Sequence, residues 1–69
     1  MRTRFFATDE ENNLYLLDKN DNILVQLDRA ELNKFETKED RAWKIRITFD
    51  YYCDSEDYKA LRKFANAVA

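Results

Sequence analysis

The sequence contains no glycine, no proline and no histidine, and it has one cysteine and one serine. Without glycine, the chain cannot form the glycine-rich loops whose backbone approaches a phosphate group closely. Turns that need a positive φ must use Asn or Asp, which tolerate that region best after glycine. The segments Asn12-Asn13 and Asn20-Asp21-Asn22 stand where such turns are expected.

The missing histidine excludes Ser–His and Cys–His catalytic pairs and removes the commonest transition-metal ligand. Cys53 is expected to be a small buried hydrophobe rather than an activated thiol, because nearby carboxylates such as Asp50 and Asp54 disfavour a thiolate. A lone cysteine forms no internal disulfide, which favours a reducing compartment and predicts a cytoplasmic location. The remaining acids lie mainly in turns and at helix starts, so we expect no enzyme, no cofactor and no metal site.

Length and composition favour a single small domain over residues 1–69 with a modest core. The chain is 45% hydrophobic and 38% charged, which is too apolar for a typical disordered protein. No apolar run approaches the roughly 18 residues needed to span a bilayer, so neither a membrane helix nor a signal peptide is expected. The formal net charge of −2 argues against affinity of the whole surface for nucleic acid.

The segment Trp43–Asp50 alternates large apolar and polar residues. An extended chain would place Trp43, Ile45, Ile47 and Phe49 on one side, which is the pattern of a half-buried strand. The sequence therefore predicts a central strand here, with Trp43 buried beneath the C-terminal helix.

Three further strands are expected before this segment. Residues 2–8 alternate weakly, and residues 14–17 and 23–27 are apolar runs that flank Asp18–Asn22. Two apolar runs around turn-forming residues predict a hairpin over residues 14–27, with Ile23, Val25 and Leu27 on its core face. The start of the turn resembles a calcium loop, but Ile23 and Arg29 stand where that loop needs Gly and Glu, so a polar turn without metal is predicted.

Two helices complete the expected fold. Asp28 and Glu31 have capping-box spacing, which predicts a short helix from Asp28 to about Phe35 with Ala30, Leu32 and Phe35 on its buried side. Glu36–Asp40 is expected to be a loop. After a cap at Asp54 or Ser55, an amphipathic stripe predicts a C-terminal helix; its apolar members are Tyr58, Leu61, Phe64, Ala65 and Val68.

These elements give an α+β fold with the order β-β-β-α-β-α and a mostly antiparallel sheet. We expect the C-terminal helix to cover one face of that sheet, because neither could bury its apolar side alone.

The leading functional hypothesis is a small non-catalytic binding protein that acts as a regulator or inhibitor through a protein interface. Such roles are common among the small accessory proteins of phages and other mobile elements, and this step is analogy. Acidic loops and exposed tyrosines would make the contact, since acidic fields steer association and Tyr is enriched in interface cores. The predicted partner-binding residues are Glu39, Asp40, Tyr51, Tyr52 and Asp54.

Two alternatives remain open. In the first, a basic face of the sheet binds single-stranded nucleic acid by phosphate pairing and base stacking. Its residues would be Arg2, Arg4, Lys44 and Arg46. In the second, the chain is a structural homodimer formed through an exposed strand edge or the tyrosine-bearing surface.

Overall fold

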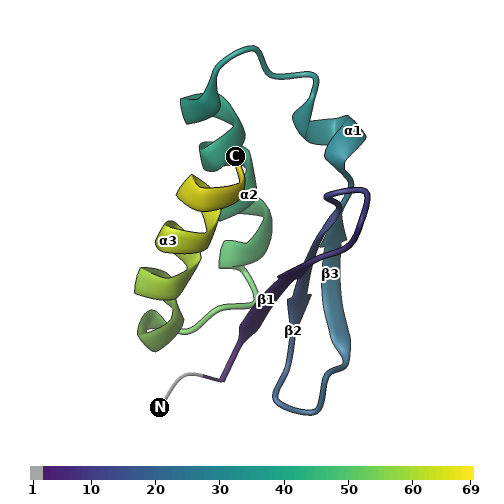
Figure 1. Cartoon of the computed structure of the whole chain (residues 1–69). Coiled ribbons are helices and arrows are strands. Elements are labelled where there is room, and N and C mark those ends of the chain that lie inside the picture. The colour runs from purple at the N-terminus through teal and green to yellow at the C-terminus, as the bar shows by residue number, and fades with distance from the viewer. Residues whose placement is uncertain (1–2) are drawn as a thin grey trace.

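A three-stranded antiparallel sheet forms one layer and two helices form the other in the computed structural model, which describes residues 3–69 (Figure 1). The strands are β1 (Phe5–Thr8), β2 (Leu14–Leu17) and β3 (Ile23–Leu27), and each pairs with the next along the chain. The helical elements are α1 (Arg29–Leu32), α2 (Lys38–Asp50), the 3₁₀ turn η1 (Ser55–Asp57) and α3 (Tyr58–Val68). The predicted α+β class is confirmed, and α3 packs on the sheet through a stack of Phe64 on Phe6.

Both hairpins close with the same five-residue loop. In the second loop, Asp18 Oδ1 accepts from the backbone N–H groups of Asn20 and Asn22, and Oδ2 accepts from the Asn22 side chain. The first loop repeats these three bonds, with Asp9 as the acceptor and Glu11 and Asn13 as the donors. The fourth residue of each loop has positive φ: 66° at Asn12 and 65° at Asp21. The hairpin predicted over residues 14–27, with its turn at Asp18–Asn22, is confirmed.

The core face of β3 differs from the prediction at one end. Leu27 is buried and Val25 half-buried, but Ile23 is 60% exposed. Leu16 pairs with Val25, whereas the next residue, Leu17, pairs with Ile23, so the register shifts by one residue. Paired residues share a face of the sheet, and the shift therefore puts Ile23 on the face opposite Val25.

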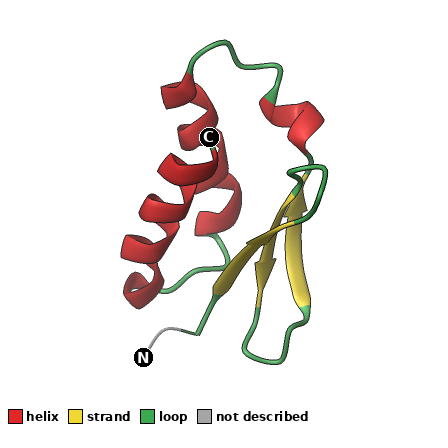
Figure 2. Ribbon diagram, in the orientation of Figure 1, coloured by secondary structure: helices red, strands yellow, loops and turns green. Residues whose placement is uncertain are grey.

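The predicted central strand at residues 43–50 is wrong, because this segment lies within helix α2 (Figure 2). The expected loop at Glu36–Asp40 is also wrong in part, since Thr37 caps the helix and α2 begins at Lys38. The Thr37 Oγ1 accepts from Asp40 N at 3.1 Å, and Glu39 and Asp40 lie in the first turn, where acids interact favourably with the helix dipole. The element order is thus β-β-β-α-α-α, with η1 before the last helix.

The alternating pattern arises from two apolar stripes on opposite sides of α2. Ala42, Ile45 and Phe49 are spaced by three and four residues, and all three are buried. Trp43 and Ile47 are offset from them and face solvent, with 49% and 46% of their surfaces exposed. The predicted burial of Trp43 is therefore wrong. Two interleaved i, i+4 stripes imitate the period of two that a strand would show.

Three phenylalanines join the two layers. Phe6 of β1 stacks on Phe64 of α3 at a centroid distance of 5.1 Å, and Phe49 of α2 lies 6.3 Å from Phe6 and 6.4 Å from Phe64. Ten buried apolar residues make up the surrounding core among residues 3–69: Leu14, Leu16, Leu27, Leu32, Ala42, Ile45, Phe49, Cys53, Leu61 and Ala65. The stripe predicted for the last helix lines this core, except that Tyr58 is 40% exposed.

The short helix α1 ends earlier than predicted. Leu32 is buried and Phe35 half-buried, but Ala30 is exposed, so its predicted burial is wrong. The Asp28 carboxylate accepts from Gln26 Nε2 at 2.7 Å and forms no side-chain cap. The Arg29 guanidinium instead holds this region, because it donates to the backbone oxygens of Asn12 and Val68.

A buried carboxylate fixes the start of β1 to the start of α3. Asp57 is fully buried, and its Oδ1 accepts from the backbone N–H groups of Thr3 and Arg4 at 3.2 Å each. Its Oδ2 accepts from Asp54 N at 3.0 Å. The segment between α2 and α3, which begins with Tyr51 and Tyr52, is thereby held in place.

Candidate protein-binding surface

The outer side of α2 carries large apolar residues that remain about half exposed or more. Trp43, Ile47 and Tyr51 follow at intervals of four, and we call them the α2 ridge. At 100° per residue they lie within about 80° of one another on the helix surface. Trp43 and Ile47 are about half exposed and Tyr51 is 87% exposed. This ridge points away from the core stripe of Ala42, Ile45 and Phe49.

The predicted partner-binding residues lie at the two ends of the ridge. Glu39 and Asp40 are exposed in the first turn of α2. Tyr51, Tyr52 and Asp54 follow the last turn, roughly 17 Å further along the helix axis at 1.5 Å per residue. The structure therefore does not gather these five residues at one point. Sequence reasoning missed Trp43 and Ile47, which connect the two groups, because it placed both in the core.

A detectable signal for the ridge was present in the sequence. Glu39, Trp43, Ile47 and Tyr51 are each four residues apart, which is the spacing of one row on a helix surface. The row becomes informative only when the segment is recognised as helical.

The two tyrosines after α2 have different environments. Their rings meet edge to face, with centroids 5.1 Å apart and an interplanar angle of 84°. Tyr52 is 38% exposed, less than half the exposure of Tyr51. Its backbone oxygen accepts from Arg4 Nε at 2.6 Å, so the turn beneath the rings is attached to β1. The exposed Tyr51 ring is thus presented from an anchored segment.

The basic sheet face proposed for nucleic-acid binding does not exist as predicted. Lys44 and Arg46 belong to the middle of α2 and not to the sheet. Arg4 precedes β1, and its guanidinium donates to Tyr52 O and Thr3 O. Arg2 lies outside the described residues. The structure therefore separates Arg4 from Lys44 and Arg46.

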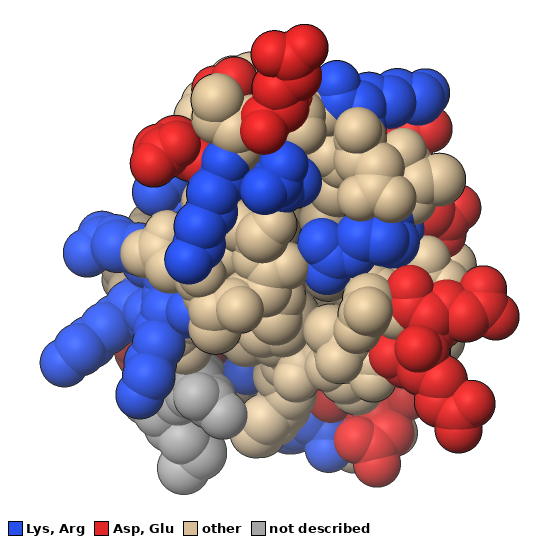
Figure 3. Space-filling view, turned by 45° about the horizontal axis from the view of Figure 1, so that its top comes forward, with Lys and Arg blue, Asp and Glu red and all other residues tan. Residues whose placement is uncertain are grey.

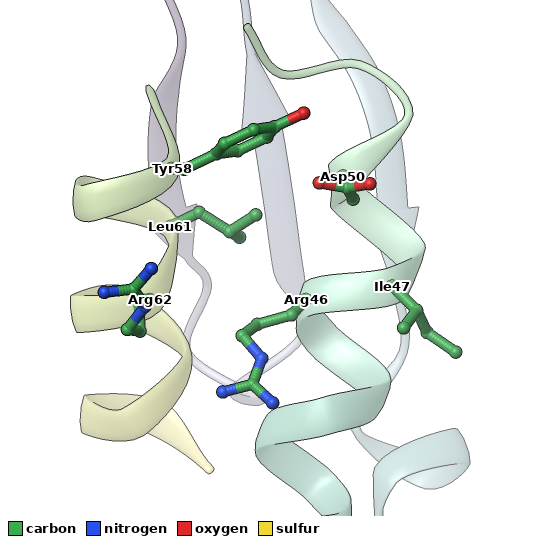
Figure 4. Close-up of a pocket in the computed structure, with 6 residues that line it drawn as sticks. All are labelled: Arg46, Ile47, Asp50, Tyr58, Leu61 and Arg62. Carbon is green, nitrogen blue, oxygen red and sulfur yellow. The ribbon is translucent and has the colours of Figure 1, made fainter. Parts of the chain in front are cut away.

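A groove runs beside the ridge, between α2 and α3, and we call it the arginine groove (Figure 4). Its volume is about 450 Å³. The residues that line it are Arg46, Ile47 and Asp50 from α2 and Tyr58, Leu61 and Arg62 from α3. Ile47 belongs to both the ridge and the groove wall, so the two features form one continuous surface.

The Asp50 carboxylate affects Tyr58 across one end of the groove. Its negative charge, together with partial burial and a side-chain hydrogen bond between the two residues, raises the pKa of Tyr58 above the ordinary value of 10.0. The phenol therefore remains a protonated hydrogen-bond donor at neutral pH.

Cys53 lies behind this surface and is 8% exposed, as expected for a small buried hydrophobe. Burial, followed by the negative charge of Asp57, raises the pKa of its thiol to about 11. The thiolate population at neutral pH is correspondingly very small.

Acidic side chains are concentrated on the sheet layer, and the last helix is basic. In Figure 3, Lys and Arg gather mainly on the left, the side of the long helices, and Asp and Glu mainly on the right, the side of the sheet. Helix α3 carries Lys59, Arg62 and Lys63 and no acid. Residues 9–31, which include β2 and β3, hold seven acidic and two basic residues. A net acidic protein thus has a basic side.

Comparison of the chain with known protein families, curated proteins and solved structures finds no match. Within residues 3–69, no helix is both long and apolar enough to cross a membrane. The same residues contain no cluster of three or more His, Cys, Asp or Glu that could hold a metal ion.

Proposed function

We propose that this chain is a non-catalytic binding protein that regulates or inhibits another protein through the α2 ridge. The observation that carries the proposal is the exposure of Trp43 and Ile47 at i, i+4 spacing on a regular helix. Trp and Tyr are enriched among the residues that dominate binding energy at protein interfaces. Covering a half-exposed side chain of this size stabilises a complex by roughly 1–2 kcal/mol before the costs of association.

The charges around the ridge suit a protein partner. Glu39 and Asp40 lie at one end and Asp54 near the other, while the large apolar side chains of the ridge occupy the middle. Such a centre with a charged rim is the usual arrangement of protein interfaces. A phosphate backbone would gain nothing from Ile47 and would be repelled by the acids at both ends.

A matched pair of substitutions tests the proposal. Ile47→Ser removes an apolar side chain from the ridge, and Ile23→Ser removes the same side chain from the outer face of the sheet, where it is 60% exposed. A tagged wild-type chain is used to recover a partner from its native cell extract, and the affinity of each variant for that purified partner is then measured. Ile47→Ser should weaken binding at least tenfold and Ile23→Ser less than threefold.

Other outcomes would refute the ridge as the interface. Equal affinities of both variants would show that Ile47 takes no part in binding. A selective loss in Ile23→Ser would move the interface to the sheet. Circular dichroism of both variants shows that each is folded before the comparison is made.

A second candidate function is nucleic-acid binding by the helix layer, favoured by the absence of acids from α3. Its affinity would fall steeply with salt, by roughly one log unit per phosphate contact for a tenfold increase. Reversing Lys59 and Lys63 of α3 to Glu should abolish such binding, while a contact centred on the apolar ridge persists because neither residue lines the groove. Submicromolar oligonucleotide binding at physiological salt, lost on this reversal, would replace the protein-binding proposal.

A further inference from the structure

The arginine groove is lined by two arginines, one from each of its helices. In Figure 4, Arg46 extends from α2 into the space between the helices, and Arg62 lies on α3 at the other side of that space. Within residues 3–69, neither arginine forms a hydrogen bond or an ion pair, whereas Lys34 forms an ion pair with Glu31. By contrast, Arg4, Arg29 and Arg41 all donate to backbone oxygens. Arg46 and Arg62 are thus free to bind an external acceptor.

The groove combines these cations with an apolar wall. Leu61, which is 3% exposed, and the half-exposed Ile47 both line it. Beyond Ile47 the apolar surface continues onto Trp43 and Tyr51 of the ridge. A segment that occupied both features would need an anionic group beside apolar side chains.

The opposite end of the groove has the reverse polarity. Asp50 and Tyr58 face one another there, and the Tyr58 hydroxyl remains protonated. A long run of phosphates would meet the Asp50 charge, whereas an isolated carboxylate would contact the arginine end alone. The alternation of sign along the groove therefore favours a peptide over a nucleic-acid strand.

We propose that the arginine groove binds an acidic amphipathic helix of the protein partner, with one of its carboxylates held between Arg46 and Arg62. This inference rests on the proposed protein-binding function. Two adjacent helices offer a groove in which a third helix packs, and apolar anchors three or four residues from the carboxylate would cover Ile47 and Trp43. Guanidinium groups bind carboxylates in a planar, two-pronged geometry, so two of them specify one acid strongly.

A displayed library of random 16-residue peptides, selected on the whole wild-type chain, provides the probe. The test variant is Arg46→Gln with Arg62→Gln. The matched control is Lys59→Gln with Lys63→Gln, which removes the same charge from the basic side but leaves the groove lining intact. Selected peptides should carry Asp or Glu three or four residues from apolar side chains. Their affinity should fall at least tenfold for the test variant and less than about threefold for the control.

The outcomes separate this inference from the proposed function. Peptides that lose affinity for Ile47→Ser but not for the arginine variant would preserve the protein-binding function and overturn the acidic occupant. Selected peptides that show no preference for Asp or Glu would likewise preserve the protein-binding function and overturn the acidic occupant. A library that yields no peptide specific for the wild-type chain would count against both proposals.

Two direct measurements identify the other occupants. If a 16-nucleotide thymidine strand binds and the arginine variant abolishes this binding, the groove receives phosphate and the proposal is wrong. If sedimentation shows a wild-type dimer that Ile47→Ser dissociates, the occupant is a second copy of this chain, and the proposal is wrong again. Thermal melting of each variant, followed by circular dichroism, confirms folding, since both arginines lie outside the core.

Discussion

Replacing Phe49 and Trp43 with Ala distinguishes the helical α2 from an extended strand. A strand would bury both rings on one face, whereas α2 buries Phe49 completely and leaves Trp43 half exposed. Phe49 also stacks against Phe6 and Phe64, so its loss leaves a cavity where the two layers meet. The structure therefore predicts very different losses of stability from two aromatic residues in the same helix.

The magnitudes follow from burial. A fully buried Phe→Ala change costs about 3–5 kcal/mol of unfolding free energy, as transfer and cavity terms add. A chain of this length has roughly 3–10 kcal/mol in total, so Phe49→Ala should be close to unfolded at 25 °C. Phe49→Leu retains most of the apolar volume and should lose about 1–2 kcal/mol, which keeps the site measurable. Trp43→Ala should lose about 1 kcal/mol, because half of the ring is already in water.

Urea unfolding followed by far-UV circular dichroism measures these losses without relying on the tryptophan that one variant removes. With a slope near 1 kcal/mol per molar urea, Trp43→Ala should shift the midpoint by about 1 M. Acrylamide quenching of the single tryptophan gives an independent check, since Trp43 should be quenched appreciably in the native protein. If Trp43→Ala destabilised the fold as much as Phe49→Ala, and native Trp43 resisted quenching, the helical placement of the ridge would be refuted.

Two further predictions concern titratable groups. A hydrogen bond from Tyr15 holds the pKa of the Asp9 carboxyl below its ordinary value of 3.8, and hydrogen bonds from Asn22 do the same for Asp18. The two carboxylates should therefore add stability above about pH 4, and this stability should be lost as the pH falls through their folded-state pKa values. Carbon-detected NMR titration should find both values lowered, and Asp18→Asn should be less sensitive than the wild type to unfolding between pH 5 and pH 2. With a pKa of about 11, the Cys53 thiol should be about one part in a thousand ionised at pH 8, so iodoacetamide should label it at least a hundredfold more slowly in the native protein than in urea. Labelling at the rate of an unfolded thiol would show that Cys53 is accessible.

The proposed interface also accounts for the unusual composition of α2. A helix that only covered a sheet would show apolar residues on one side and polar ones on the other. Here the second side carries Trp43 and Ile47, which lie outside the buried core and remain about half exposed. Two large apolar residues that are partly exposed to water lower the solubility of a protein. A binding partner that covers them would explain why they are present.

Local chemistry was enough to predict the hairpin turn and the last helix. Each loop closes within five residues through an Asp side chain and an Asn or Asp with positive φ. The residues of Asp18–Asn22 are therefore sufficient to determine the turn. The spacing of Leu61, Phe64 and Ala65 likewise fits only a helix that buries one side. These features depend on neighbours along the chain, and the sequence alone determined them.

The state of residues 43–50 depended on tertiary structure. Trp43, Ile45, Ile47 and Phe49 fit a strand with one buried face equally well as a helix with an apolar residue on each side. The choice between strand and helix depends on contacts with residues that are distant along the chain. Phe49 packs against Phe6 of β1 and Phe64 of α3, and these contacts favour the helix. The arginine groove has the same origin, since Arg46 and Arg62 line one groove only when α2 and α3 pack side by side. Turns and one helix were thus fixed locally, whereas the exposed ridge and the groove were set by contacts between layers, because burial is a property of the assembled core.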